Sequence, residues 1–175
     1  MTFKSNLIPL KIPVNNPPVT QPFGVNPKYY RSYGISAHNG IDYAGSVNKY
    51  CYSAHRGKVT AVKFNRIYGN MVVLISFDGT FLTTYCHLKK FLVKVGQSIE
   101  AKCLIGEIGS TGNSTGRHLH FGLQLLPTTL NGYAGYIDPA PYFKTIETSI
   151  KPPVDNSMEA RKARREATLR TLQAM

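Results

Sequence analysis

Hydrophobic and polar residues alternate over the segment 118–125, HLHFGLQL. Side chains on one face of a β-strand recur every second residue, whereas two such residues on a helix would lie about 200° apart around its axis. The alternation therefore predicts a half-buried strand that presents two imidazoles from one face. The buried face would carry Leu119, Phe121, Leu123 and Leu125, and the other face His118, His120, Gly122 and Gln124.

The segment 57–88 repeats this kind of alternation in successive runs. The Asp78-Gly79 dipeptide between two of the runs is a strong signal for a hairpin turn. In the last run Tyr85 and His87 share a face, and we expect both to point away from the core. Two further short strands are expected after this segment, so the pattern predicts a mainly β fold built on an antiparallel sheet. The runs are 57–64, 71–77 and 80–88, followed by the short strands within 92–109.

Prolines interrupt residues 1–19, which suits an extended arm that lies along the domain or along a partner, rather than a helix. Residues 21–36 are rich in glycine, proline and tyrosine, and we expect an ordered loop there. Its tyrosines would either wall a groove or pack against the core. These tyrosines are Tyr29, Tyr30 and Tyr33.

Residues 156–175 consist of strong helix formers, preceded by a proline pair that ends any regular element. Asn156 or Ser157 would cap the predicted helix. Its basic residues form either a solvated face or an anchor to wall, nucleic acid or another subunit. The chain therefore divides into an arm (1–19), a central domain (20–147) and a proline linker with a basic helix (148–175). The basic residues are Arg161, Lys162, Arg164, Arg165 and Arg170.

The chain has 175 residues and a net charge of +12, from 21 Lys and Arg against 9 Asp and Glu. A surplus of this size favours a polyanionic partner such as nucleic acid, an anionic membrane or an acidic cell wall. Three cysteines without a C-x-x-C pair indicate free, mostly buried thiols rather than a disulfide framework or a zinc finger. The N-terminus lacks the apolar run of a signal peptide, and we expect no membrane span.

The candidate chemistry rests on His38, Asp42, His87, His118 and His120, all on predicted strands or their ends. A catalytic zinc site uses three protein ligands from histidine and carboxylate and keeps one position open. Two histidines and one aspartate that hold the metal, with two spare histidines nearby, match the needs of a zinc hydrolase. The remaining histidine, His55, lies in a predicted turn, where we expect it to be exposed and without a role.

Three motifs resemble the M23 (LytM/lysostaphin-like) peptidoglycan endopeptidases. They are HNGID at 38–42, YCHL around His87 and GSTGNSTGRHLHFGLQL at 109–125. The family patterns are H-x-x-x-D, Y-x-H-L and G-x-T-G-x-S-T-G-x-H-L-H-F. The motifs occur in the family's order and spacing, and the resemblance covers about residues 20–143.

The resemblance implies a lysostaphin-like peptidase domain with a sheet-floored groove, and Zn²⁺ bound by His38, Asp42 and His120. It also implies that His118 and His87 handle protons around the attacked carbonyl. His118 would be the general base and His87 the oxyanion partner, or the reverse. The implied reaction is hydrolysis of peptide bonds in peptidoglycan cross-links or stems.

Two other classes of function compete with this one. The first is a non-enzymatic peptidoglycan-binding, activator or virion module on the same fold, although such relatives usually lack one or more of the five residues. The second is nucleic-acid binding, which the charge suggests but no recognisable motif supports. We further expect a phage protein that acts at the bacterial wall. It would be carried in the virion tail, with arm and helix on neighbouring subunits, or held as an endolysin in the host cytoplasm.

Overall fold

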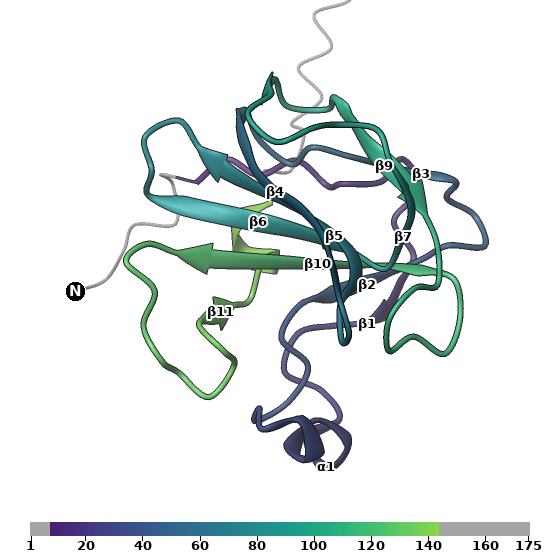
Figure 1. Ribbon diagram of the computed structural model, residues 1–175. Coiled ribbons are helices and arrows are strands. Elements are labelled where there is room, and N and C mark those ends of the chain that lie inside the picture. The colour runs from purple at the N-terminus through teal and green to yellow at the C-terminus, as the bar shows by residue number, and fades with distance from the viewer. Residues whose placement is uncertain (1–7, 144–175) are drawn as a thin grey trace, which may run out of the picture. The chain divides into compact units, whose positions relative to one another are not determined.

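The computed structural model describes residues 8–143 and consists mainly of antiparallel strands (Figure 1). The larger sheet contains β1 (Val19–Gln21), β2 (Ile41–Ala44), β4 (Gly57–Asn65), β5 (Gly69–Ser76), β6 (Phe81–Cys86), β8 (Ser98–Ile99), β10 (His118–Leu125) and β11 (Tyr136–Ile137). Its strand order is β1-β2-β10-β6-β5-β4-β8, with β11 paired to β10. The expected fold class is therefore confirmed, and the Asp78-Gly79 turn joins β5 to β6 as predicted.

A smaller sheet packs against one face of the larger one, at the upper right of Figure 1. It consists of β3 (Tyr50–Tyr52), β7 (Leu88–Phe91) and β9 (Leu104–Ile108), in the order β3-β9-β7. Buried side chains of both sheets form one hydrophobic cluster, so the core lies between them. The opposite face of the larger sheet lies outside this core.

Strand β10 lies in the middle of the larger sheet, between β2 and β6. Leu119, Phe121 and Leu123 on its core face are fully buried, as the alternation predicted. His120 on the other face pairs in register with Asp42 of β2 on one side and Cys86 of β6 on the other. The strand therefore carries the core on one face and candidate chemistry on the other.

The apolar residues of segment 8–18 are part of the core rather than a free surface. Ile8, Leu10 and Val14 are buried in the main cluster. The backbone N–H of Leu10 donates to the carbonyl of Tyr142, and the N–H of Tyr52 donates to the carbonyl of Pro13. This segment is thus fastened to the domain by both burial and hydrogen bonds.

Short helical turns complete the described chain. The expected loop at 21–36 contains a four-residue helix α1 (Pro27–Tyr30) and a 3-10 turn η2 (Arg31–Tyr33). A second 3-10 turn, η3 (Ala140–Tyr142), follows β11 in a segment expected to be loop. Within residues 8–143, no helix has the length and apolar character needed to cross a bilayer. The predicted helix at 156–175 lies outside the described residues.

The prediction for the end of β6 was wrong about Tyr85. Its side chain is fully buried in the core, where its ring lies 5.4 Å from that of Phe121 and its hydroxyl accepts the backbone N–H of Ala54. His87 nevertheless leaves the core, because its φ of 61° places it in the left-handed region. The alternation ends at Cys86, so Tyr85 and His87 point in different directions.

The prediction for His55 was also wrong, because this residue is buried rather than exposed. Its Nδ1 donates to the carbonyl of Arg56, and its Nε2 lies 3.0 Å from the Thr83 hydroxyl. The Thr83 hydroxyl in turn contacts the Tyr85 hydroxyl at 3.1 Å. His55 thus begins a buried polar chain that runs into the core. The expected free thiols are confirmed, with Cys51 and Cys86 buried and Cys103 half-buried.

Candidate metal centre

Three buried side chains meet on the face of the larger sheet opposite the core. His38 lies shortly before β2, separated from it by Asn39 and Gly40, while Asp42 lies in β2 and His120 lies opposite Asp42 in β10. Asp42 Oδ1 is 2.9 Å from His120 Nδ1 and 3.2 Å from His38 Nε2. The two ring nitrogens are 3.0 Å apart. The structure therefore brings the three expected metal ligands to one point.

The donor atoms at this point fit a divalent zinc ion. His38 Nδ1 donates its proton to the carbonyl of Pro22 at 2.8 Å, so the neutral ring directs the lone pair of Nε2 at Asp42 and His120. Nε2 of His120 is buried without a partner among the described residues, so the polar contacts of this ring are all at Nδ1. Two imidazole nitrogens and one carboxylate oxygen, converging in a buried position, are the donor set of a catalytic zinc site.

The electrostatics of the three residues suit ligation. Burial alone would raise the pKa of Asp42, but its close contacts with the His120 and His38 rings hold it well below its usual range. Burial lowers the pKa of His120. The carboxylate is therefore ionised and the imidazole neutral near pH 7, as metal binding requires.

His118 lies two residues before His120 and shares its face of β10. Its Nδ1 donates to the carbonyl of Gly116 at 2.8 Å, so Nε2 is the ring nitrogen left for other partners. That Nε2 lies 3.7 Å from Asp42 Oδ2. His118 is thus oriented by its own loop and placed beside the metal centre.

His87 reaches the same place from the position directly after the neighbouring strand β6. Its ring centroid is 4.6 Å from that of His118 and 6.0 Å from that of His120. Its Nδ1 donates to the carbonyl of Thr111 at 2.7 Å, and its backbone N–H donates to the carbonyl of Tyr68. Burial lowers the pKa of His87 to about 4, so the ring is neutral near pH 7. The five expected residues therefore form one cluster.

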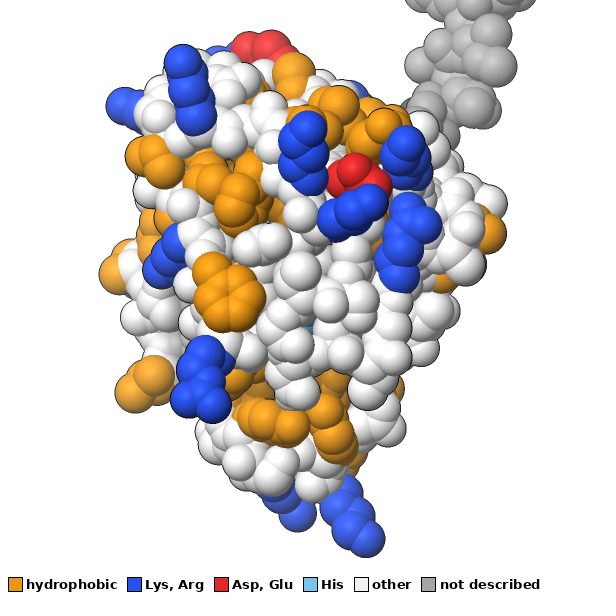
Figure 2. Space-filling model, turned by 45° about the vertical axis from the view of Figure 1, so that its right-hand side comes forward, with side chains coloured by type: hydrophobic (Ala, Val, Ile, Leu, Met, Phe, Trp, Pro, Cys, Tyr) orange, Lys and Arg blue, Asp and Glu red, His pale blue; other side chains and the backbone are white. Residues whose placement is uncertain are grey.

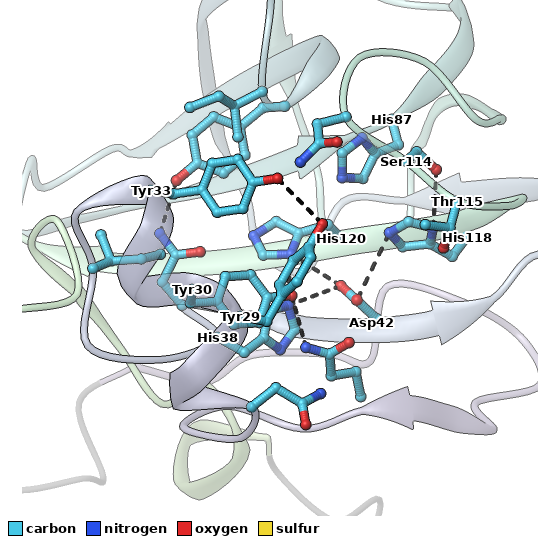
Figure 3. Close-up of a pocket in the computed structure, with 17 residues that line it drawn as sticks. Tyr29, Tyr30, Tyr33, His38, Asp42, His87, Ser114, Thr115, His118 and His120 are labelled. Atoms are coloured by element: carbon cyan, nitrogen blue, oxygen red, sulfur yellow. Dashed lines mark hydrogen bonds and ion pairs between the residues drawn. The ribbon is translucent and has the colours of Figure 1, made fainter.

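The cluster lies at the bottom of a cleft of about 390 Å³ (Figure 3). The tyrosines of α1 and η2 form one wall, as one of the two interpretations of that segment expected. The hydroxyls of Tyr29 and Tyr33 are 3.4 Å apart. The ring of Tyr30 stacks on His38 at 5.2 Å, and burial raises the pKa of Tyr30 to about 12. Asn113, Ser114 and Thr115 of the loop before β10 also line the cleft.

Tyr68 and Asn39 are among the cleft residues that the sequence patterns did not identify. The Asn39 side-chain amide donates to the Tyr68 hydroxyl at 2.8 Å, and the Tyr68 ring centroid lies 5.7 Å from that of His120. Tyr68 belongs to the turn between β4 and β5, which the polarity pattern identified only as a loop. No local signal shows that this turn bends over the cleft. Asn39 lies inside the HNGID motif, directly after His38, and this position is the one local signal of a place at the site.

A His-Asp-His cluster that could hold a metal ion, with two more histidines, on an antiparallel sheet below an open cleft, is the arrangement of a metallopeptidase type of site. The chain belongs to peptidase family M23, whose family model matches residues 36–134. This range contains all five residues of the cluster. The family expected from the three motifs is therefore confirmed.

Particular relatives support the same assignment. "Peptidoglycan DD-endopeptidase ShyC" of Vibrio cholerae is 39% identical over 87 residues, which are 50% of this chain and 20% of ShyC. A zinc-containing peptidase of Vibrio cholerae has a TM-score of 0.62 at 30% identity, covering 78% of this chain and 40% of that one. The catalytic domain of the antimicrobial peptidase lysostaphin from Staphylococcus simulans has a TM-score of 0.57 at 28% identity, covering 81% of this chain and 96% of that one. This chain thus spans about a fifth of the curated relative.

Proposed function

We propose that this protein is a zinc-dependent endopeptidase that hydrolyses peptide bonds in the cross-links or stems of bacterial peptidoglycan. The single observation that carries the proposal is the convergence of His38, Asp42 and His120 beside two imidazoles in an open cleft. Membership of family M23 and similarity to a peptidoglycan DD-endopeptidase and to lysostaphin support the choice of substrate.

The chain's own residues supply the binding and proton steps. His38, Asp42 and His120 would hold Zn²⁺, which when bound polarises the scissile carbonyl and makes water more acidic. His118 accepts the proton of the attacking water at Nε2, because its Nδ1 proton is already given to the carbonyl of Gly116. That Nε2 lies 3.7 Å from Asp42 Oδ2, so the proton is taken up beside a carboxylate.

We assign His87 to the carbonyl oxygen of the substrate. Its Nδ1 proton is given to Thr111, so Nε2 is the atom left for the substrate. Nε2 donates only when the ring is charged, and negative charge that develops on the carbonyl oxygen favours that form. The tyrosine wall and the loop 113–115 hold the peptide between them in the cleft.

The experiment measures zinc content and release of muropeptides from purified sacculi for four variants of the full chain. His120→Ala is expected to lose both zinc and hydrolysis. His118→Ala and His87→Ala are expected to keep zinc and to lose hydrolysis by about 10²- to 10⁴-fold. Gln124→Ala, on the same face of β10 but outside the cleft, serves as the control. A wild-type protein without zinc, or unchanged hydrolysis by His120→Ala, would refute the proposal.

We also propose that the protein acts on the wall as part of a phage tail, with its basic C-terminal region on neighbouring subunits, whereas segment 8–18 packs on its own domain. The support is the sequence alone, namely the basic segment 156–175. Mass spectrometry of purified phage particles should detect the chain at a fixed ratio to the tail proteins. Its absence from particles, with accumulation in the infected cell before lysis, would instead indicate an endolysin.

A further inference from the structure

Basic side chains gather on the outer face of the smaller sheet. Lys89 and Lys90 of β7 are both exposed, because the register of β7 shifts between Leu88 and Lys90 and the regular alternation is lost. Lys49 precedes β3, and Arg117 precedes β10. In Figure 2, which turns this side of the molecule forward, blue side chains surround a red one at the upper right. We call the following group the basic shelf: Lys49, Lys89, Lys90 and Arg117.

One carboxylate lies among these cations. Glu107 of β9 is 3.3 Å from Lys89 Nζ and pairs in register with Lys90. It also pairs in register with Tyr50, whose ring has Lys49 Nζ 5.2 Å from its centroid. A single carboxylate cannot neutralise four cations, so the shelf keeps a positive potential.

Arg117 connects the shelf to the loop that walls the cleft. Its Nε donates to the carbonyl of Ile108 at 3.1 Å, and its Nη2 donates to the carbonyl of Asn48 at 2.9 Å. The guanidinium is therefore fixed against the smaller sheet while the next residue, His118, enters the cleft. The shelf and the cleft are thus joined through consecutive residues.

The two surfaces share the loop 109–117 as a common wall. Ser114 lines the cleft, whereas Ser110 lines a hollow together with Lys89, Glu107 and Arg117. The two serine hydroxyls are 3.0 Å apart across the loop. A polymer chain that leaves the cleft past Ser114 therefore reaches the basic shelf directly. Asp42 is the only carboxylate that lines the cleft among residues 8–143, so little repels an anionic polymer.

We propose that the basic shelf binds the free carboxylates of peptidoglycan stem peptides on the part of the polymer that lies beyond the scissile bond. This inference rests on the proposed function, because it takes the polymer in the cleft to be peptidoglycan. Carboxylates complement the lysines in charge, and a polymer offers them repeatedly. The shelf would thus raise affinity for intact wall without touching the reacting atoms.

The test is co-sedimentation of the full-length protein with sacculi in a chelator, which prevents hydrolysis. Lys89→Gln/Lys90→Gln is compared with Lys58→Gln/Lys94→Gln, a control that removes the same charge from exposed lysines elsewhere. At low salt the shelf variant should bind about three- to tenfold more weakly than wild type, and the difference should shrink as salt is added. The control variant should lose clearly less affinity for sacculi. Thermal unfolding checks that both variants are folded.

Chemical treatment of the sacculi identifies the ligand. Capping the stem carboxylates as amides should abolish the difference between wild type and shelf variant, whereas removing phosphodiester polymers with hydrofluoric acid should preserve it. Equal losses for both double variants, or loss of the difference only after hydrofluoric acid, would overturn the inference. The proposed function is judged separately, by muropeptide release in zinc, so shelf-dependent binding without release would refute the enzyme but not the binding surface.

Discussion

Gly40, in the middle of HNGID, makes room for the His120 ring. A Cβ built on Gly40 would lie 2.6 Å from His120 Cε1 and 2.6 Å from the carbonyl oxygen of Phe121. Gly40→Ala is therefore expected to displace the ring and weaken zinc retention by about tenfold or more, as changes beside metal ligands do. Zinc content after dialysis against a weak chelator measures the effect.

Gly116→Ala is the matched control for that prediction. Gly116 lies close to the same site, but a Cβ there meets nothing within 4 Å. This variant should retain zinc as wild type does. Equal retention by both variants would show that the space at Gly40 has no part in holding His120.

The buried His55 should make the free energy of unfolding depend on pH. Its Nδ1 donates to the carbonyl of Arg56, and its Nε2 lies 3.0 Å from the Thr83 hydroxyl in a buried position. Burial lowers the pKa of His55 from its ordinary value of 6.5, because a charged ring would lose its hydration there. The folded protein therefore prefers neutral His55.

The direction of this pH dependence follows from the number of protons that the folded and unfolded chains bind. As pH falls below about 6.5, the unfolded chain binds a proton at His55 that the folded chain does not, so the free energy of unfolding decreases. One such proton changes it by at most about 1.4 kcal/mol per pH unit. Denaturant unfolding of metal-free protein at pH 7.5 and 5 should show a smaller acid loss for His55→Gln than for wild type. An equal loss in both would contradict the role of His55.

Among single residues, sequence patterns identified the five members of the site cluster but not the burial of His55. The cluster residues fall in motifs with fixed spacing, and such spacing is local information. The burial of His55 depends on Thr83 and Tyr85, which lie about thirty residues further along. A turn-like local sequence therefore indicated an exposed side chain, although tertiary contacts bury it.

Among elements, β10 was predictable from polarity. One of its faces must be apolar to pack in the core, and the other must carry polar side chains for the cluster. The end of β6 was not predictable, because a left-handed non-glycine residue ends the alternation at His87. Such a conformation costs about 1–2 kcal/mol, and the hydrogen bonds of His87 to Thr111 and Tyr68 offset this cost. These partners come from two other loops, so the segment's own sequence does not reveal them.

The N-terminal segment should contribute to the stability of the core. Leu10 is fully buried between the core and the segment around Phe143, with which it forms a β-bridge. Leu10→Ala is expected to lower the free energy of unfolding by about 3 kcal/mol, because it removes buried methyl groups and leaves a cavity. Val19→Ala, where the side chain is half exposed, should cost clearly less. If denaturant unfolding shows that both variants lose the same free energy of unfolding, the N-terminal segment does not support the core.

At the scale of the molecule, the class of fold and the meeting of distant motifs were predictable, but the packing of two sheets was not. The smaller sheet joins β3, β7 and β9, which are far apart in sequence and short. Short strands have little periodicity, so their pairing depends on the rest of the core. The basic shelf beside the cleft follows from that pairing, and the net charge of the chain alone did not locate it.

The whole domain should be more stable when it holds zinc, because the ligand atoms converge only in the folded chain. His38 and His120 are 82 residues apart in sequence, so the unfolded chain offers no comparable site. Free Zn²⁺ at 1,000 times its dissociation constant would add about 4 kcal/mol to the free energy of unfolding. The melting temperature should therefore rise with the logarithm of zinc concentration and fall in chelator. Asp42→Asn removes the charge of one ligand at nearly constant volume, and should melt at a temperature that responds little to zinc. If the melting temperature of the wild-type protein does not change with zinc concentration, the three side chains do not bind zinc.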